Sequence, residues 1–379
     1  MKVIVLGAGL VGGPMAEDLA ADPGFDVTVA DISESALESV GSGMPVSKVK
    51  KDLSEPEKVK KLVRDFDLVI SAVPGFMGFR TFRAVIQAGR DVVDIAFFPE
   101  DPFELDKLAK DKNVTAIMDC GVAPGMSNIL IGSVDHILDE TDNCEIYVGG
   151  LPERRQYPYE YKAVFSPADV IEEYTRPARY VANGELITRE ALSDPEYIDF
   201  PELGTLEAFN SDGLRTLAGT IDAPNMKEKT LRYPGHIEKI RVLRETGFFS
   251  KEPLEINGTE ISPLDFTSRL LFPLWEFREG DRDITVMKVI VEGKKDNGDV
   301  RYTYSLFDRY DEEKSVHSMA RTTGYTATAA ARMVAEKLYA RKGMSPPEYI
   351  GKDRSCVDFI IEQLRERDVI YNEEIEIFS

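Results

Sequence analysis

The first thirty residues contain two short apolar runs separated by a glycine-rich turn and a helical pattern. The runs are Val3 to Leu6 and Phe25 to Ala30. Apolar runs of this length between turn signals are typical of buried parallel strands. The pattern therefore predicts a strand, a helix and a second strand at the start of the chain.

The same alternation continues as far as residue 119. Apolar runs predict four more strands, and apolar residues at helical spacing predict helices between them. The expected strands are Val46 to Leu53, Asp67 to Val73, Asp91 to Ala96 and Val114 to Asp119, and the expected helices are Ser33 to Val40, Pro56 to Phe66, Gly78 to Gly89 and Pro102 to Asp111. Six strands in this order predict an α/β domain with a Rossmann-type, doubly wound parallel sheet, ending near residue 125.

The pattern changes after Cys144. Apolar residues alternate over Thr285 to Val291 and Val300 to Leu306, and turn sequences occur at Asn183-Gly184 and at Asp296 to Asp299. This predicts a second α+β domain over residues 126–319 with a mainly antiparallel sheet, which we expect to bind substrate and to dimerise. Helical patterns at Ala320 to Lys342 and Val357 to Arg367 follow, and we expect residues 320–379 to return to the first domain.

Composition narrows the class of protein. The chain has 379 residues, 43% of them hydrophobic, which is enough for two cores. No apolar run reaches the roughly 20 residues of a membrane span, and no signal-peptide pattern is visible, so we expect a soluble, cytoplasmic protein. The net charge of −21 argues against nucleic acid or an anionic membrane as a partner. The three cysteines are too scattered for a disulfide framework or a zinc cluster, and no metal site is expected.

The turn after the first strand reads Gly7-Ala8-Gly9-Leu10-Val11-Gly12. The first glycine permits a tight turn, the second lets the backbone approach a pyrophosphate, and the third lets the helix pack closely on the strand. The helix amino terminus then faces the phosphates. Because a strand precedes the glycines and a helix and an acidic strand end follow them, the turn predicts a dinucleotide site. The alternatives are a strand-to-helix turn that has lost its cofactor, and an FAD site.

Other residues complete the expected cofactor site. Asp31 ends the second strand, where a carboxylate hydrogen-bonds the adenosine ribose and repels a 2′-phosphate, so NAD is favoured over NADP. Asp52 and Leu53 are expected beside the adenine. Ligands of open parallel sheets lie outside the carboxyl ends of the strands, so Ala72, Val73 and Pro74 are expected beside the nicotinamide half.

The segment Asp119 to Asn128 joins the last predicted strand to the next helix. Its glycines and proline suit an interdomain hinge or an active-site wall, and the two interpretations are compatible. Asp119 lies at a strand end, where it is expected near the cofactor and is a candidate catalytic residue. Cys120, beside it, is interpreted as a small packed residue rather than a nucleophile.

Four later blocks carry a resemblance to a known family. They are Gly149 to Pro152, Phe165 to Tyr174, Thr230 to His236 and Ser318 to Gly324. With the glycine turn and the segment from Asp119 to Asn128, the chain resembles the saccharopine dehydrogenase family over nearly its whole length. The resemblance implies NAD-dependent oxidative deamination of the ε-amino group of L-lysine, which gives ammonia and a semialdehyde that cyclises to a piperideine carboxylate.

An amine oxidation needs a residue that accepts a proton. The candidates are the three histidines. His236 is the first choice because it follows a strand and precedes a helix, and the alternatives are an amino-terminal helix cap and a histidine that orders the loop. His136 lies in a helical pattern and is interpreted as structural, and His317 stays open.

A lysine substrate also needs groups that bind its charges. Arg232 and Arg321 are candidates for the carboxylate, and both could equally be surface ion-pair residues. Asp169 and Glu172 are candidates for the α-ammonium, but acids in a first helical turn are expected for dipole reasons alone. The matching blocks place Gly150, Phe165, Ser166 and Thr322 at the substrate as well.

Two alternative functions and a homodimeric assembly are also compatible with these residues. A reductase that condenses an amino acid with a semialdehyde, as saccharopine reductase and carboxynorspermidine synthase do, would share the fold. An NAD-binding regulatory protein would keep the glycine turn and Asp31 without turnover. A homodimer is expected, since closed two-fold pairs are the commonest assemblies.

Overall fold

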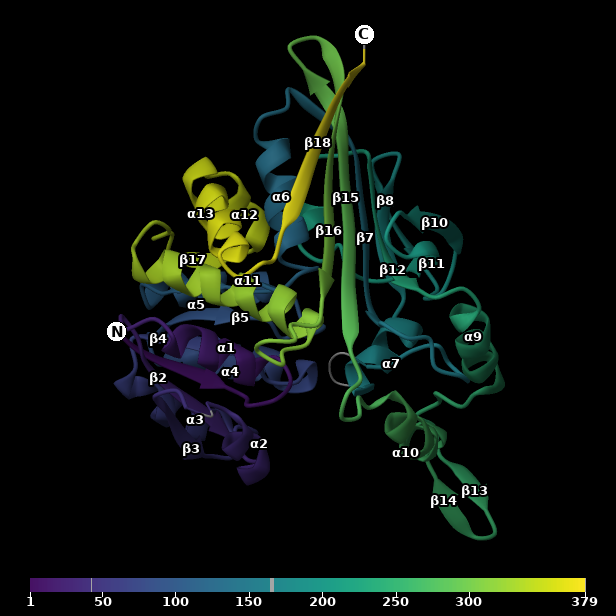
Figure 1. The fold of residues 1–379 in the computed structure, drawn as a ribbon, viewed down its shortest axis with the longest axis horizontal. Coiled ribbons are helices and arrows are strands. Elements are labelled where there is room, and N and C mark those ends of the chain that lie inside the picture. The colour runs from purple at the N-terminus through teal and green to yellow at the C-terminus, as the bar shows by residue number, and fades with distance from the viewer. Residues whose placement is uncertain (42, 164–166, 379) are drawn as a thin grey trace. The chain divides into compact units, whose positions relative to one another are not determined.

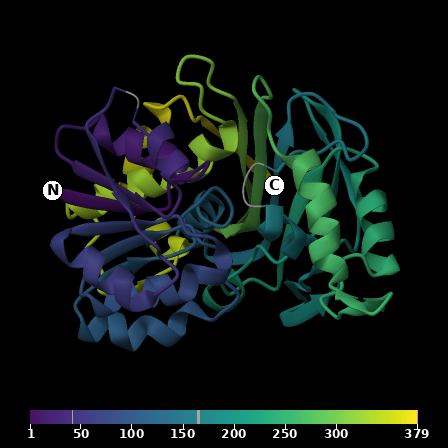
Figure 2. The ribbon, with the colours of Figure 1, turned by 90° about the horizontal axis from the view of Figure 1, so that it is seen from below.

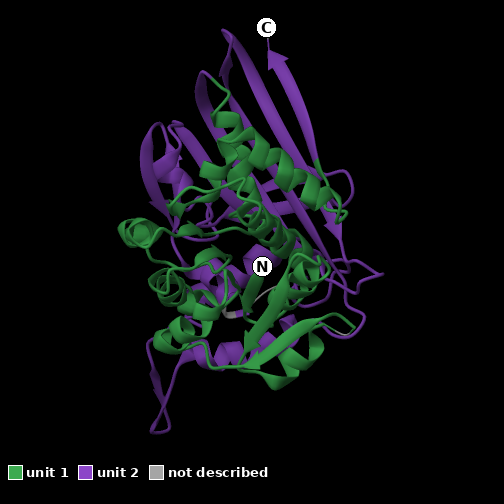
Figure 3. Ribbon diagram, turned by 90° about the vertical axis from the view of Figure 1, so that its left-hand side faces the viewer, with its two compact units in different colours: residues 1–138, 319–371 green, residues 139–318, 372–379 purple. Residues whose placement is uncertain are grey.

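A computed structural model describes residues 1–41, 43–163 and 167–378. The chain forms two compact units (Figure 3). Unit 1 comprises residues 1–138 and 319–371, and unit 2 comprises residues 139–318 and 372–379. The expected boundary at residue 125 therefore differs from the observed one, because the helix Met126–Asp135 belongs to unit 1.

Unit 1 is built on a seven-stranded sheet in which every described pair of neighbouring strands is parallel. The order is β17-β6-β5-β4-β1-β2-β3. The bounds are β1 (Lys2–Leu6), β2 (Asp26–Asp31), β3 (Val46–Lys50), β4 (Leu68–Ser71), β5 (Asp91–Asp94), β6 (Thr115–Ile117) and β17 (Gly343–Ser345). The six expected strands and the doubly wound fold are thus confirmed, and β17 is an addition that the sequence pattern did not indicate.

Helices cover both faces of this sheet (Figures 1 and 2). They are α1 (Gly12–Ala20), α2 (Glu34–Ser39), α3 (Pro56–Leu62), α4 (Gly75–Gln87), α5 (Asp106–Asp111), α6 (Met126–Asp135), α11 (Ser318–Ala335), α12 (Pro347–Gly351) and α13 (Arg354–Arg365), with short 3-10 turns at Val63–Asp65 and Pro102–Leu105. The central strands are apolar on both sides for this reason. Ile4, Val69 and Phe82 are fully buried in the shared core.

A buried ionic network fastens the late segment of unit 1 to its first helix. The carboxylate of Asp18 in α1 accepts hydrogen bonds from Arg332 in α11 at 2.8 Å and from Arg367 at 2.6 Å. The hydroxyl of Thr328 donates to the same carboxylate at 2.5 Å. All the charged groups involved are nearly buried, so each depends on the others for compensation. Residues 319–371 therefore complete unit 1.

Unit 2 contains a nine-stranded mixed sheet. Its strands are β7 (Glu140–Pro152), β8 (Ala178–Ala182), β9 (Glu185–Arg189), β10 (Glu196–Phe200), β11 (Gly204–Asn210), β12 (Asn225–Arg232), β15 (Asp283–Lys295), β16 (Gly298–Arg309) and β18 (Tyr371–Phe378). Most pairs are antiparallel, as expected, but β12 runs parallel to β7. The predicted turns connect β8 to β9 and β15 to β16. Residues 372–379 belong to this unit rather than to unit 1, because β18 adds to the edge at β16.

Within the described residues, four helices and a small hairpin complete unit 2. The helices are α7 (Pro167–Thr175), α8 (Leu217–Thr220), α9 (His236–Thr246) and α10 (Pro263–Trp275), and the hairpin consists of β13 (Leu254–Ile256) and β14 (Thr259–Ile261). An aromatic core that includes Tyr161, Tyr174, Phe209 and Trp275 lies between helices and sheet. Among the described helices of both units, none is long and apolar enough to span a membrane.

Candidate functional site

The glycine turn of unit 1 is closely packed at its two ends and open in its middle. Gly7 has a φ of +107°, and a Cβ added there would lie 2.6 Å from the carbonyl oxygen of Ala72. A Cβ on Gly12 would overlap the carbonyl oxygen of Gly7. A Cβ on Gly9 would meet nothing within 4 Å. The backbone is therefore exposed where a pyrophosphate would approach it.

This turn lies at the point where the strand order reverses. β1 has β2 on one side and β4 on the other, so the carboxyl ends of β1 and β4 lie next to each other at this point. The amino termini of α1 and α4 follow these two strands, and neither helix has an acidic residue in its first turn. Two helix termini without acids near a strand-order reversal form a site suited to anions.

Asp31 connects the second strand to the glycine turn. One carboxylate oxygen accepts a hydrogen bond from the amide of Ala8 at 2.8 Å, and the other accepts from the amide of Ser33 at 2.7 Å. These bonds hold the negative charge beside the turn. Asp31 therefore lies beside the glycine turn, where the sequence pattern places it.

Exposed apolar side chains surround the same turn. Leu10 is 52% exposed, Ile32 is 63% exposed, and Phe76 at the start of α4 is 71% exposed. Sequence reasoning named Leu10 but missed Ile32 and Phe76. Both could have been recognised in the sequence, because each is an apolar residue that directly follows a strand end and does not belong to a periodic pattern. Such side chains suit contact with flat rings of a ligand.

Two expected cofactor residues lie in the core instead. Leu53 and Val73 are both buried in the main apolar cluster of unit 1, so their side chains support the sheet rather than line a surface. Asp52 is partly exposed and accepts a hydrogen bond from the amide of Ser54 at 2.9 Å. Ala72 contacts the glycine turn, and Pro74 is the residue before α4.

Asp119 lies on a compact loop at the end of β6. It is 2% exposed and has a φ of 51°. The next amide, that of Cys120, donates to the carbonyl of Asp94 at 2.9 Å, so two buried acids meet at neighbouring strand ends. Asp94 was not identified from the sequence. Burial, with Asp119 and Asp94 nearby, raises the pKa of the Cys120 thiol to about 12, in agreement with its interpretation as a packed residue.

The block from Ser318 to Gly324 packs α11 onto the cofactor helix. A Cβ on Gly324 would lie 2.9 Å from the Met15 side chain, so the two helices approach closely there. Arg321 is 5% exposed and donates to the carbonyl of Arg367 at 2.7 Å. Thr322 is fully buried. Both were expected to bind substrate, but their burial within unit 1 gives them a packing role.

Arg232 is likewise buried inside unit 2. It is 2% exposed, donates to the Glu173 carboxylate at 2.7 Å and stacks 4.4 Å from the centre of the Tyr161 ring. Burial disfavours the charge of Arg232, but Tyr174, Tyr161 and Glu173 together outweigh it and raise the pKa of Arg232, while burial raises the pKa of Glu173. The expectation that Arg232 binds a substrate carboxylate is therefore corrected, because a carboxylate of the protein already occupies its guanidinium.

His236 is the first residue of α9 and is fully buried. Its Nδ1 is 2.7 Å from the carbonyl oxygen of Tyr159, which only accepts, so Nδ1 carries the proton. Its Nε2 is therefore the acceptor for the Tyr174 hydroxyl at 2.9 Å. Burial and the charge of Arg232 lower the pKa of His236 to about 3. With both nitrogens engaged and no exposure, this histidine orients the aromatic core, and its surroundings do not support the expected role as a base.

The other two histidines are accessible. His136 follows the last residue of α6, is exposed, and belongs to none of the clusters described above. His317 is 22% exposed, and its Nδ1 lies 3.1 Å from the carboxylate of the buried Asp283. It stacks against Phe277 and Tyr310. A carboxylate at one nitrogen fixes the ring and leaves the other nitrogen for another partner.

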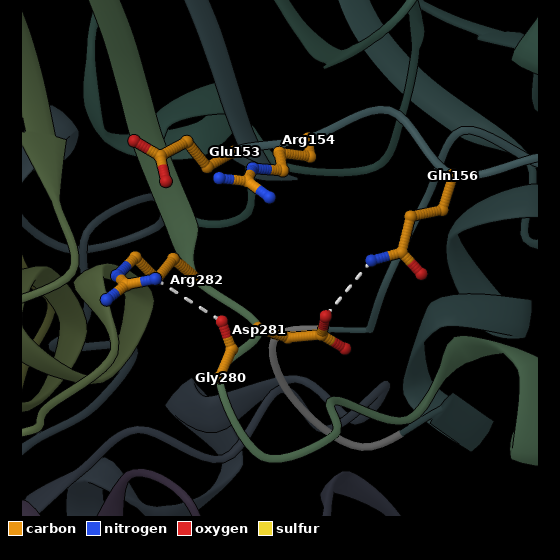
Figure 4. Close-up of a pocket in the computed structure, with 6 residues that line it drawn as sticks. All are labelled: Glu153, Arg154, Gln156, Gly280, Asp281 and Arg282. Carbon is orange, nitrogen blue, oxygen red and sulfur yellow. Dashed lines mark hydrogen bonds between the residues drawn. The ribbon is translucent and has the colours of Figure 1, made fainter.

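A polar pocket of about 140 Å³ follows the end of β7 in unit 2 (Figure 4). It is lined by Glu153, Arg154, Gln156, Gly280, Asp281 and Arg282. Most of its charges are already paired, since Asp281 accepts from Gln156 at 3.0 Å and Arg282 donates to Glu312 at 2.8 Å. Gly150, expected at the substrate, lies upstream within β7 and is buried. Phe165 and Ser166 lie outside the described residues. In the described ranges, no group of His, Cys, Asp and Glu is arranged to hold a metal.

Two family models match nearly the whole chain. The saccharopine dehydrogenase NADP binding domain matches residues 3–117, and the saccharopine dehydrogenase C-terminal domain matches residues 121–370. The chain belongs to the saccharopine dehydrogenase family. The match to the nucleotide-binding domain model includes the glycine turn.

Relatives within the saccharopine dehydrogenase family carry different names. The mitochondrial alpha-aminoadipic semialdehyde synthase of Mus musculus is 27% identical over 286 residues, which are 71% of this chain and 31% of that protein. This chain therefore spans about a third of that relative. Carboxyaminopropylagmatine dehydrogenase of Synechocystis sp. is 25% identical over 377 residues, which are 93% of both chains.

A solved structure from the saccharopine dehydrogenase family shares the fold. The apo histidine-tagged saccharopine dehydrogenase (L-Glu forming) from Saccharomyces cerevisiae matches with a TM-score of 0.80 at 20% sequence identity, and the match covers 99% of both chains. The likeness supports the α/β architecture with its second mixed sheet.

Proposed function

We propose that the protein is an NAD-dependent amine dehydrogenase that removes the ε-amino group of L-lysine, the reaction of lysine 6-dehydrogenase. The observation that carries the cofactor assignment is the Asp31 carboxylate, which both Ala8 and Ser33 hold beside the glycine turn. The lysine assignment rests on the later sequence blocks that resemble this branch of the family.

The choice of NAD over NADP follows from charge. A carboxylate fixed at the end of β2 accepts hydrogen bonds from the ribose hydroxyls of NAD and repels the 2′-phosphate of NADP. The family model that matches this region is named for NADP, so this chain is proposed to depart from it at Asp31. Ile32 and Leu10, both exposed, are proposed to contact the adenine.

The reaction needs a hydride acceptor, a proton acceptor and water. When bound, the nicotinamide accepts the hydride from the carbon that carries the ε-amine. The protein's part is to orient the amine, to remove the proton that the ammonium loses, and to admit water that hydrolyses the resulting imine. The balance is lysine as its ε-ammonium, NAD⁺ and water giving the semialdehyde, ammonium, NADH and one proton, after which the α-amine closes the ring with loss of one water.

We propose His317 as the proton acceptor. It is partly exposed and the buried carboxylate of Asp283 orients its ring. Removing a general base costs about 10²- to 10⁴-fold in rate. His317→Asn is therefore expected to lower kcat by about 100-fold or more while leaving NAD affinity unchanged. His136→Asn changes an exposed histidine outside any such cluster and is the matched control.

The test of the reaction is NADH formation with purified protein, L-lysine and NAD, compared with NADP. Turnover with lysine and NAD is the expected result. Asp31→Ser is expected to narrow the preference for NAD over NADP at least tenfold, whereas Asp26→Asn, which removes an exposed carboxylate at the opposite end of β2, is expected to leave it unchanged. A preference for NADP in the unaltered protein would contradict the assignment.

A condensing reductase is the second candidate, favoured by the match to the carboxyaminopropylagmatine dehydrogenase over 93% of both chains. That enzyme class joins an amine and an aldehyde with reduction. Activity with saccharopine, or with an aldehyde and an amine together with reduced cofactor, and silence with lysine would replace the first proposal by this one. NAD binding without turnover of either kind would indicate a regulatory protein.

A further inference from the structure

The pocket that follows β7 contains charged side chains that the protein itself leaves open. Its lining carries two guanidiniums and two carboxylates, those of Arg154, Arg282, Glu153 and Asp281. Arg282 is engaged, because it donates to the Glu312 carboxylate at 2.8 Å. Arg154 is exposed and has no hydrogen bond or ion pair with any residue that the structure describes. Its guanidinium can therefore bind a ligand without losing a partner.

The Glu153 carboxylate, next to Arg154 in the sequence, is engaged at one oxygen. Its Oε1 accepts a hydrogen bond from Arg309 at 3.1 Å, whereas its Oε2 has no partner among the described residues. Both Glu153 and Arg154 border the pocket (Figure 4). An open carboxylate oxygen and an open guanidinium complement a ligand that carries an ammonium and a carboxylate on the same carbon atom. The equal number of lining cations and anions also suits a head group without net charge.

A buried lysine holds the loop that forms another part of the pocket. Lys162 is 2% exposed, donates to the carbonyl of Glu276 at 2.7 Å and lies 3.5 Å from the Asp281 carboxylate. That carboxylate also accepts from the amide of Arg278 at 2.8 Å and from Gln156 at 3.0 Å. Burial alone would raise the pKa of Asp281, but these hydrogen bonds and the lysine lower it below its ordinary value. The loop is thus held in place without a ligand, which reduces the entropy cost of binding one.

Aromatic rings connect the pocket to His317, the proposed proton acceptor. The Arg282 guanidinium lies 5.7 Å from the centre of the Tyr310 ring, and that centre is 5.2 Å from the centre of the His317 ring. The ring of Phe277, in the same loop as Asp281, lies 4.6 Å from His317. An amino acid with its head in the pocket can extend an apolar chain along these rings towards the histidine. The four-carbon stem of lysine, which ends in an amine, is such a chain.

We propose that this pocket binds the α-amino-acid head of the substrate, with the carboxylate on Arg154 and the α-ammonium on Glu153. This role rests on the proposed function, because it takes the substrate to be an amino acid that reacts at its far end. It assigns the substrate carboxylate to an arginine that sequence reasoning did not name. Arg232 and Arg321, which it did name, are buried and donate to groups of the protein.

Three ligands without an ε-amine separate the two contacts. L-norleucine has the head and the four-carbon stem of lysine, n-hexanoate lacks the α-ammonium of norleucine, and n-pentylamine lacks its carboxylate. Their dissociation constants from the full-length protein are measured by ligand-observed NMR titration. Arg154→Gln is expected to weaken norleucine and hexanoate binding by about tenfold or more and to leave pentylamine unchanged, because a charge-assisted hydrogen bond is lost. Glu153→Gln is expected to weaken norleucine and pentylamine binding and to leave hexanoate unchanged.

Arg155→Gln is the matched control. Arg155 is exposed and adjacent, but its guanidinium lies 4.5 Å from the centre of the Tyr233 ring and does not line the pocket. All three dissociation constants are expected to stay unchanged in this variant. The proposal would be overturned if norleucine did not bind the unaltered protein, or if it bound the Arg154→Gln protein equally well.

Steady-state turnover separates a failure of this proposal from a failure of the proposed function. With L-lysine and NAD, Arg154→Gln is expected to raise KM about tenfold or more and to change kcat by less than about threefold, since the head is bound equally before and during the reaction. Norleucine binding that depends on Arg154, in a protein that does not turn over lysine, would refute the lysine reaction alone. Lysine turnover with an unchanged KM in Arg154→Gln would refute the role of the pocket alone.

Discussion

The polar groups of the two units are arranged in opposite ways. In unit 1 a Cβ added at Gly9, in the middle of the glycine turn, would meet nothing within 4 Å, and the apolar side chains of Leu10 and Ile32 are exposed. In unit 2 the cation Arg232 and the ring of His236 have partners on every side within the same unit. The turn of unit 1 is thus open to a ligand, whereas Arg232 and His236 of unit 2 are engaged by side chains of their own unit.

This difference shows that a recognisable sequence motif can reflect either ligand binding or packing. Gly7 and Gly12 have no room for a side chain, so the close approach of the backbone in the turn requires glycine at both positions. Arg232 and His236 belong to a block that is equally recognisable in the sequence, yet their surroundings explain them by stability alone. Family resemblance therefore identified the blocks, and only the contacts distinguish binding from packing.

The largest effect is expected from a substitution that breaks the buried Arg232–Glu173 ion pair of unit 2. Arg232→Met leaves the Glu173 carboxylate without its cation, and removing one partner of a buried pair costs about 3 to 5 kcal/mol of unfolding free energy. Urea unfolding followed by fluorescence reports on this core, because Trp275 is the single tryptophan and lies in it. NAD affinity of the folded protein is expected to stay unchanged. Arg154→Met, at an exposed arginine, is the control, and equal stability of the two variants would contradict the assignment.

The next largest effect is expected from a substitution that fills the glycine turn of unit 1. Gly12→Ala forces a methyl group against the carbonyl of Gly7, and we expect NAD affinity to fall about 100-fold, or ~2.7 kcal/mol. Titration followed by NADH fluorescence measures it. Gly9→Ala fits the empty protein and is expected to weaken NAD binding without changing stability. Gly219→Ala, in a helix of unit 2 with open space around it, is the control. Full affinity in the Gly12 variant would show that the turn is not the cofactor site.

The smallest expected effect is a pH dependence of the unfolding free energy, which tests whether His236 is neutral in the folded protein. Its pKa is about 3 in the folded protein and 6.5 ordinarily, so between these values the unfolded chain binds a proton that the folded chain does not. This part of the stability is fully present above pH 6.5 and is lost as the pH falls towards 3, by about 2 kcal/mol at pH 5.

Comparison of two variants isolates that contribution. The loss of unfolding free energy between pH 7 and pH 5 is expected to be smaller in His236→Gln than in the unaltered protein. His136→Gln, at an exposed histidine, is expected to keep the full loss. If His236→Gln kept it too, His236 would titrate normally when folded, and the proposal that it is buried and neutral would fail.

The parallel sheet could be predicted because its signals are local. Each of its first six strands is an apolar run long enough to stand out, and the order of strands and helices determines the doubly wound topology. β17 was missed because Gly343 to Ser345 is three residues without any pattern. The parallel pairing of β12 with β7 was missed because a pairing between distant strands leaves no mark on either of them.

The site could be predicted only where chemistry and local geometry coincide. The glycine turn and Asp31 are such a case. Leu53 and Val73 were misplaced because a strand end looks the same whether its side chains face a ligand or the core. His236 and Arg232 were misjudged because the rings that pack against them, Tyr161 and Tyr174, come from distant segments.

The interleaving of the two units along the chain has a consequence for biosynthesis. Unit 1 needs α11, β17 and Arg367, all of which are translated after unit 2 has been almost completely made. While the ribosome still holds these residues, Asp18 has no cation and one edge of the parallel sheet has no neighbour. The nascent chain must therefore carry an unfinished nucleotide-binding domain through most of its synthesis, a stage at which exposed sheet edges invite aggregation and chaperones are needed most.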